Sequence, residues 1–241
     1  MIEVRQLFAL AEFSEALKLQ QQIWGFADSE LLPLRLFVVA SRIGGHVFGA
    51  YHGGAMVGFC LGVPGLKPDG RPYLHSHMLG VLPGYRNTGV GRSLKLRQRD
   101  DVLARGLDLI EWTFDPLEIK NAFFNIERLG AIVRRYVENE YGSTSSHLHG
   151  GLPTDRCVAE WWIASPRVEM ILAGERPVLH TEDRITVPAE MDRLRRENSQ
   201  KAREIQCANA GRFQDCFARG LAVTGFERVS SGEAYLLEPW K

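Results

Sequence analysis

The stretch VLPGYRNTGVGRSLK, residues 81–95, limits the folds open to this chain more than any other feature. The apolar segment that ends in it predicts a strand, and residues 89–105 predict a helix that ends at Gly106. Gly89 and Gly91 predict a turn whose main chain comes close to another group. A strand, a glycine-rich turn and a helix together predict an anion site, because first-turn amides and the helix dipole point to the same place.

Two common phosphate-binding patterns do not fit this turn. A P-loop has the spacing of Gly84 and Gly89, but Val90 stands where the pattern requires lysine. The dinucleotide fingerprint fits Gly89 and Gly91, but Leu94 stands where it requires a small residue. Each pattern fails at a residue on which its chemistry depends, so neither ligand class is predicted.

The hydrophobic pattern of residues 1–165 predicts an α/β fold with a mixed sheet flanked by helices. The expected order is strand, helix, helix, three strands, helix, strand, helix, strand. Gly25 is expected to end the first helix, Pro33 to begin the second, and residues 52–54 to turn a hairpin. Residues 119–142 are expected to form helical turns broken at Gly130, with a continuation that the pattern leaves open, and residues 157–165 a strand.

The C-terminal part of the chain differs in composition from the rest. Residues 189–206 and 211–220 predict two charged helices, and residues 221–229 and 233–240 can pair as a hairpin. We therefore expect a main domain over residues 1–165. Residues 166–241 are expected to form an appendage that packs on the main sheet or extends it.

Charge and composition exclude several classes of partner. The 29 basic and 29 acidic residues balance, so no net field recruits nucleic acid or an anionic membrane. No secretory signal is apparent, and no apolar run approaches the roughly 20 residues that span a bilayer. The four cysteines form no C-x-x-C pair, which favours reduced, buried thiols in a cytoplasmic protein.

The stretch at residues 81–95 resembles the coenzyme A signature of the GNAT acyltransferase superfamily, R-x-x-G-x-G after a strand that ends V-x-P. The resemblance implies a mostly antiparallel central sheet and an acyl-CoA co-substrate, and dimers are frequent among the proteins that this chain resembles, so a homodimer is one expectation. No metal is expected. It also implies that amides from Arg86 to Arg92 hold the pyrophosphate and that two strand-end residues offer main-chain groups to the pantetheine arm. The residues so assigned to coenzyme A are Val81, Leu82, Arg86, Asn87, Thr88, Gly89, Val90, Gly91, Arg92, Asn121 and Phe124.

Further residues extend the resemblance or depart from it. The family's later helix motif is matched at Asn121 and Gly130, although Asn121 is equally well explained as a helix cap. The family's usual tyrosine, a candidate acid, is replaced by Ile126, and Tyr136 or Tyr141 is the expected substitute.

The helix after the turn also carries a set of basic residues. Arg92, Lys95 and Arg99 are expected on one helix face, which either reaches the 3′-phosphate or is solvated.

Acyl transfer to an amine needs a base, and two histidines are the first candidates. His75 and His77 stand two apart on a predicted strand, hence on one face. An ordinary imidazole titrates near pH 6.5, so an acid-side limb in the rate is expected near pH 6 to 7. The pair also resembles the His-x-His of the arylalkylamine branch of the superfamily. Half-buried histidines bonded to neighbours are the equally weighted alternative, and Glu111 on the next strand is a rival base.

A metal site is the third interpretation of the histidines in this sequence. His75, His77, His147 and His149 are four imidazoles that could bind zinc, but the second pair lies in a Ser- and Gly-rich segment without carboxylate or thiolate. That segment is more simply a flap at the acceptor site.

Three functions therefore remain open. The favoured function is an N-acyltransferase that moves an acetyl, succinyl or other acyl group from coenzyme A to a small amine or amino acid. A non-catalytic acyl-CoA-binding protein is the alternative that Ile126 favours, and a histidine-ligated metal hydrolase is the third.

Overall fold

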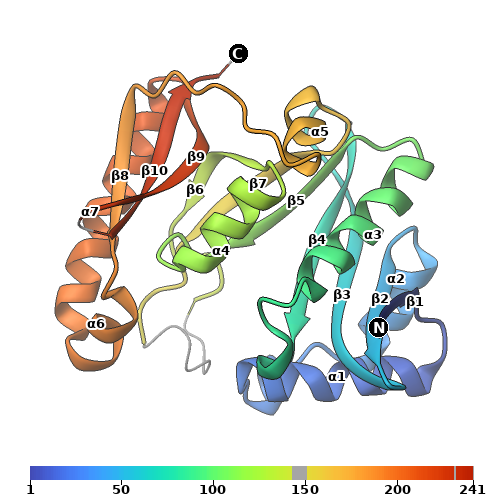
Figure 1. Cartoon of the computed structure of the whole chain (residues 1–241). Helices are drawn as coiled ribbons and strands as arrows, with labels where there is room; N and C mark the ends of the chain where they lie inside the picture. The colour runs from blue at the N-terminus through green and yellow to red at the C-terminus, as the bar shows by residue number, and fades with distance from the viewer. Residues whose placement is uncertain (143–150, 231, 241) are drawn as a thin grey trace. The chain divides into compact units, whose positions relative to one another are not determined.

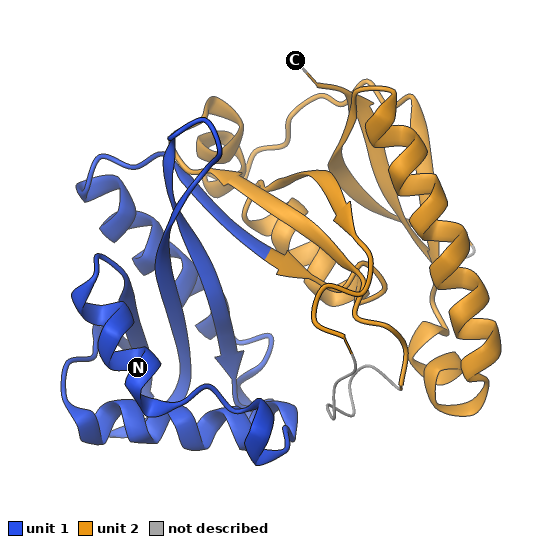
Figure 2. Cartoon of the chain, turned by 180° about the vertical axis from the view of Figure 1, so that it is seen from behind, with its two compact units in different colours: residues 1–112 blue, residues 113–241 orange. Residues whose placement is uncertain are grey.

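A computed structural model of the chain describes residues 1–142, 151–230 and 232–240. The chain divides into two compact units, Met1–Trp112 and Thr113–Lys241, which are coloured separately in Figure 2. Strand β5 (Leu109–Phe114) begins in the first unit and ends in the second. No described helix is both long and apolar enough to cross a bilayer.

The first unit is built on a sheet whose strands follow the chain order. Its strands are β1 (Ile2–Gln6), β2 (His46–His52), β3 (Ala55–Leu66), β4 (Pro72–Val81) and the start of β5. Neighbours from β1 to β4 are antiparallel, whereas β4 and β5 run parallel. Gly53 (φ 57°) and Gly54 (φ 84°) turn the β2–β3 hairpin as predicted, because both positions need positive φ.

Helices cover both faces of this sheet (Figure 1). On one face pack α1 (Leu10–Trp24), which ends at Gly25 in the left-handed region, and α2 (Leu34–Arg42), which begins after Pro33. On the other face packs α3 (Val90–Ala104) through Val90 and Leu94. Short 3-10 turns at Asp28–Glu30 and Pro83–Tyr85 complete the unit. The end of α1 at Gly25 and the start of α2 after Pro33 agree with the prediction.

In the second unit the strands follow the order β7-β6-β9-β10-β8 of the ten-stranded sheet, and these neighbours are antiparallel. Its strands are β6 (Ile132–Val137), β7 (Arg156–Trp162), β8 (Asp183–Pro188), β9 (Leu221–Val229) and β10 (Gly232–Pro239). Its helices are α4 (Ile119–Phe123), which continues as a π-helical turn over Phe124–Arg128, then α5 (Pro166–Leu172), α6 (Met191–Glu197) and α7 (Ser199–Ala218). Helix α7 packs on β6, β8 and β9.

The second unit departs from the predicted elements in three places. Strand β6 was not predicted, because a bulge at Arg134 breaks the alternation that marks a strand. Strand β8 was not predicted either. Helix α7 runs through Gly211, and the helical break falls instead at Asn198, whose side chain accepts a hydrogen bond from the Lys201 amide.

The fold class is as predicted, a mixed α/β protein with mostly antiparallel strands flanked by helices. The expected division at residue 165 stays a prediction. In the second unit β9 pairs with β6 through Val133 and Val223, and this pairing supports an appendage that extends the sheet.

Candidate active site

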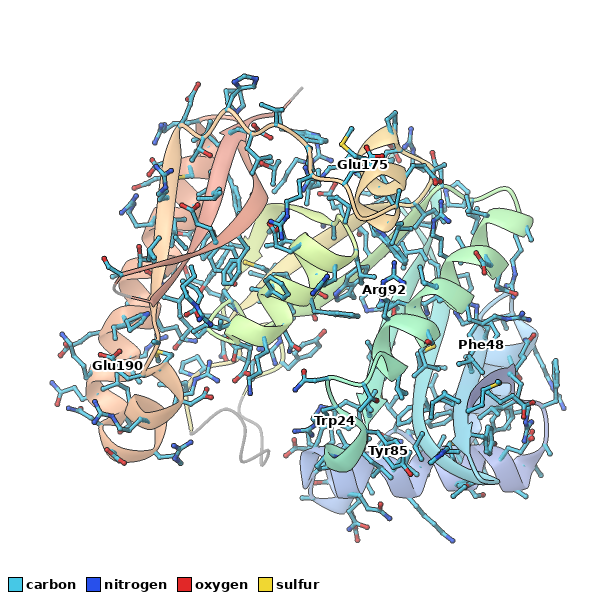
Figure 3. The ribbon with its side chains drawn as sticks, viewed as in Figure 1. Trp24, Phe48, Tyr85, Arg92, Glu175 and Glu190 are labelled. Carbon is cyan, nitrogen blue, oxygen red and sulfur yellow. The ribbon has the colours of Figure 1, made fainter. Side chains whose placement is uncertain are left out.

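The turn between β4 and α3 presents unbonded main-chain donors. Figure 3 labels Tyr85 in this turn and Arg92 in the first helical turn. The Arg86 amide donates to Pro83 O (3.2 Å), so this predicted donor is committed to the protein itself. The amides of residues 87–91 donate to no residue that the structure describes. Five adjacent donors at a helix N-terminus fit a diphosphate, and the predicted cradle therefore begins at Asn87.

Glycine geometry keeps this turn open. Gly89 has φ 91° and a Cβ added to it would meet nothing within 4 Å, so it serves the backbone conformation and leaves space above the turn. Asn87 also adopts positive φ (62°), and Thr88 Oγ1 donates to Tyr85 O (2.7 Å). Val90 is buried and anchors the helix start to the core. The turn is thus anchored to the core through Val90, and the space beside Gly89 is open.

The end of β4 offers one of its two predicted main-chain contacts. The Leu82 amide donates to Val57 O and its carbonyl accepts from Tyr85, so its main chain is used within the protein. Val81 is opposite Gly58 in a non-hydrogen-bonded pair, so its own amide and carbonyl point away from β3. The carbonyl accepts a hydrogen bond from Arg86 Nε (3.4 Å). The β4–β5 ladder is formed only by Leu74 and His75, which leaves the later edge of β4 unpaired by β5. We therefore expect the Val81 amide, and no main-chain group of Leu82, to bond to a pantetheine arm.

The predicted basic face of α3 is wrong at Lys95. Arg92 and Arg99 are half-buried on the helix, whereas Lys95 is 1% exposed and points into the core. Its Nζ donates to Ser76 Oγ (2.8 Å) and Gln98 Oε1 (3.2 Å). It also lies 3.5 Å from the centre of the Trp112 ring. Burial lowers the Lys95 pKa to about 7.

Lys95 should make folding stability depend on pH. Its folded pKa lies below its unfolded value, so between pH 7 and about 10 the unfolded chain binds a proton that the folded chain does not. The cost of burying protonated Lys95 lowers the free energy of unfolding by its full amount below pH 7, and this cost shrinks as pH rises. We expect the free energy of unfolding of the wild type, minus that of Lys95→Met, to increase by about 1 kcal/mol per pH unit over this window. Denaturant unfolding from pH 6 to 10 measures it, and a pH-independent difference would contradict it.

The two predicted histidines lie side by side on β4. Their ring centroids are 5.7 Å apart. They are two apart on the strand, and His77 is the extra residue of a bulge, because the ladder passes from Gly62–Ser76 directly to Leu61–Met78. Burial, with the charges of His77, Lys95 and Lys67 adding to it, lowers the His75 pKa to about 4. Desolvation by the surrounding protein also lowers the pKa of His77, although its side chain keeps solvent access.

The rival base Glu111 belongs to the same cluster. It is paired in register with His75 across the β4–β5 ladder, so the two side chains share a sheet face. Glu111 is 3% exposed, and its carboxylate forms an ion pair with Lys67. Lys67 also lies over the Tyr73 ring (4.8 Å). The first unit therefore brings together His75, His77 and Glu111, with Glu111 already neutralised by a partner.

Three predicted positions lie in the second unit. Asn121 is exposed inside α4 and is not its cap, because Glu118 holds that place. Phe124 is half-buried at the start of the π-helical turn. Ile126 is fully buried in that turn, so the position of the family's usual tyrosine is part of the core.

Tyr136, the predicted acid, is held in another role. Its hydroxyl donates to Asp155 Oδ2 (2.8 Å) and its ring stacks on Phe213 at 5.4 Å. Burial and the Asp155 carboxylate raise its pKa well above the ordinary value, which makes it a poorer acid. The other candidate, Tyr141, shares a hydrogen bond with Thr113 Oγ1 (2.7 Å).

We expect Tyr136→Phe to change kcat by less than about threefold and to cost on the order of 1 kcal/mol of stability through the lost hydrogen bond. Steady-state kinetics and thermal unfolding measure the two effects. A loss of kcat of about a hundredfold in a folded variant would restore Tyr136 as the acid.

The metal reading gains no support from the described residues. Within them, no three His, Cys, Asp or Glu side chains gather in a way that could hold a metal ion. His147 and His149, and the predicted flap around them, lie outside the described residues.

Comparison with known proteins assigns the family. The family model for the acetyltransferase (GNAT) family matches residues 10–130, which is half of the chain. The chain belongs to the GNAT family. Membership of this family makes it an acetyltransferase, in agreement with the acyl-CoA-dependent transferase that the resemblance of the glycine-rich turn implied. No curated protein sequence is similar enough to count as a relative.

Solved structures share the fold at low identity. The ribosomal-protein-S18-alanine N-acetyltransferase from Escherichia coli is 17% identical, with 68% of this chain and 96% of that chain covered and a TM-score of 0.54. The Salmonella typhimurium protein yncA, solved with its cofactor acetyl-CoA, is 14% identical over 68% and 97% with a TM-score of 0.54. Arabidopsis thaliana Naa50, bound to a bisubstrate analogue, is 16% identical over 66% and 97% with a TM-score of 0.51.

Proposed function

We propose that this GNAT protein transfers the acetyl group of acetyl-CoA to the amine of a small molecule or an amino acid, with the His75–His77 pair as the proton acceptor. The supporting observation is that the His75 and His77 rings lie side by side, with centroids 5.7 Å apart, at the point where the β4–β5 ladder ends. His75 has a pKa of about 4 and is unprotonated at pH 7. A base must be unprotonated before it can accept the ammonium proton of the acceptor.

The surrounding groups define how the proton leaves. Glu111 shares the face with His75, but its carboxylate is buried and already held in an ion pair by Lys67. The exposed neighbour His77 keeps access to solvent and can pass the proton outward. We therefore assign proton acceptance to the histidines and a charge-balancing role to the Glu111–Lys67 pair.

The leaving thiolate has no protein acid at the usual position. Ile126 is apolar and buried there, and the Tyr136 proton is held by Asp155. A thiolate is a fair leaving group, so departure without a protein acid is the proposed course. This explains how the family's chemistry can proceed with isoleucine in place of tyrosine.

The acceptor class is the part of the proposal that needs an assay. Solved structures of the same fold are named for a ribosomal-protein alanine and for a bisubstrate analogue with a peptide part, so both polymeric and small acceptors must be tested. Thiol release from acetyl-CoA and succinyl-CoA would be screened against small amines, both enantiomers of amino acids, and peptides with free N-termini.

Turnover with a small amine or amino acid supports the proposal, and turnover with peptides alone overturns the acceptor class. Coenzyme A binding without thiol release for every acceptor would favour the binding-protein alternative. His180→Ala, an exposed histidine in the second unit, serves as the control variant and should retain full turnover.

A further inference from the structure

A chain of buried polar groups crosses the core of the first unit beneath the histidine pair. Asp101 Oδ2 bonds His46 Nδ1 (2.7 Å), His46 Nε2 bonds Gln98 Nε2 (2.9 Å), and Gln98 Oε1 accepts from Lys95 (3.2 Å). Lys95 then donates to Ser76, the residue between His75 and His77. His46, Lys95 and Gln98 are each at most 1% exposed. A family match and a coenzyme A turn do not require such a chain.

The sheet is shaped to make room for this chain. Gly62 faces Ser76 in the ladder, and a Cβ on Gly62 would come within 2.8 Å of His46 Nε2 and 3.2 Å of Gln98 Nε2. The bulge at His77 begins at this same Gly62–Ser76 pair. The polar chain therefore ends at the point where β4 gains its extra residue.

Lys95 is a buried cation without a carboxylate against it. No described carboxylate lies within ion-pair distance of its Nζ. Asp101, at the far end of the polar chain, is bound by His46 and by Arg105 (2.6 Å). The other groups that act on it are Ser76 on β4, Trp112 on β5 and the thiol of Cys60 on β3. Its ammonium can therefore place one hydrogen on each of Ser76, Gln98 and the Trp112 face.

We propose that Lys95 is a positioning residue for the histidine pair: through Ser76 it fixes the bulge that carries His77, and its charge keeps a proton off His75. The proposal rests on the proposed function of the histidines as the base. It assigns a role in the reaction to a side chain that touches no substrate.

The two parts of this role operate at different pH. In either protonation state Lys95 has N–H groups for Ser76 and Gln98, so the bulge is supported throughout. As pH falls, Lys95 takes up a proton first, because its pKa is about 7 and that of His75 about 4. The new charge opposes a second proton on His75 across the strand. Burial is the main reason why His75 stays unprotonated in mildly acidic solution, and the Lys95 charge adds to it.

The test is the titration of His75 in the free protein, followed by nitrogen-15 NMR of the imidazole and assigned with His75→Ala. In Lys95→Met we expect the His75 midpoint to move up by about half a pH unit or more, because a neighbouring positive charge is removed. Lys18→Met removes an exposed lysine from α1 and should leave the midpoint unchanged. Lys95→Met with Ser76→Ala is the second variant, since it leaves no serine hydroxyl without its donor.

The outcomes separate this proposal from the proposed function. A His75 midpoint that stays within 0.1 unit in both folded variants, on the order of the NMR error, overturns the electrostatic role of Lys95. An unchanged His77 resonance in both variants overturns the bulge role. If the midpoint moves but His75→Ala with His77→Ala retains full activity, Lys95 acts on a pair that is not the base, and the proposed function fails instead.

Discussion

Gly91→Glu is expected to weaken coenzyme A binding at least a hundredfold while the protein stays folded. Gly91 is the second residue of α3, in the segment whose amides are unbonded. A carboxylate there repels a diphosphate and competes for the same donors. It does not harm the helix, because acidic residues are favourable in a first turn. Isothermal calorimetry with coenzyme A measures the loss.

The choice of glycine makes this experiment decisive. Gly89 has φ 91°, so a side chain there would strain the backbone and confuse a folding defect with a binding defect. Gly91 is inside the helix and carries no such strain. Gly211→Glu in α7, where an added Cβ meets nothing within 4 Å, changes the net charge equally and should bind coenzyme A normally. Wild-type affinity in a folded Gly91→Glu protein would exclude this turn as the coenzyme A site.

The sequence could predict this turn because its determinants are local. Gly89, Gly91 and the helix that follows them depend on backbone conformation and on periodicity, both of which are legible within fifteen residues. The commitment of the Arg86 amide and of Leu82 was not predictable, since it depends on contacts with Pro83 and Val57. A motif names the residues near a ligand, and only the hydrogen-bond pattern shows which of them have a free donor.

Lys95 shows where periodicity misleads. Its spacing from Arg92 and Arg99 placed it on a solvated basic face, but the side chain enters the core because Ser76, Gln98 and Trp112 receive it there. These partners come from β4, α3 and β5, so no local pattern could reveal them. One sequence signal was present: residues 94, 98 and 102 form the buried stripe of α3, and Lys95 adjoins it.

The second unit was harder to predict for a related reason. The bulge at Arg134 hid β6, and the acid role given to Tyr136 overlooked Asp155, which is 19 residues further along the chain and meets it only through the β6–β7 pairing. The expected rate limb at pH 6 to 7 assumed an ordinary histidine, which the buried surroundings of His75 do not provide. Burial and neighbouring charges lower the pKa of His75 to about 4.

The joint substitution His75→Ala and His77→Ala is expected to lower kcat by about 10²–10⁴, the usual contribution of general base catalysis, and to change coenzyme A affinity less than twofold. In the wild type, activity should be flat above pH 5 and fall as pH drops toward 4, because protonation of His75 removes the base. This limb should vanish in the double variant, whose residual rate depends only on solvent as base.

An assay of thiol release at fixed times from pH 4 to 8 measures both pH–rate profiles, with folding checked by circular dichroism at each pH. A wild-type limb at pH 6 to 7, or a double variant with normal kcat, would move the base to another residue, and Glu111, freed by Lys67→Met, would be the next to test.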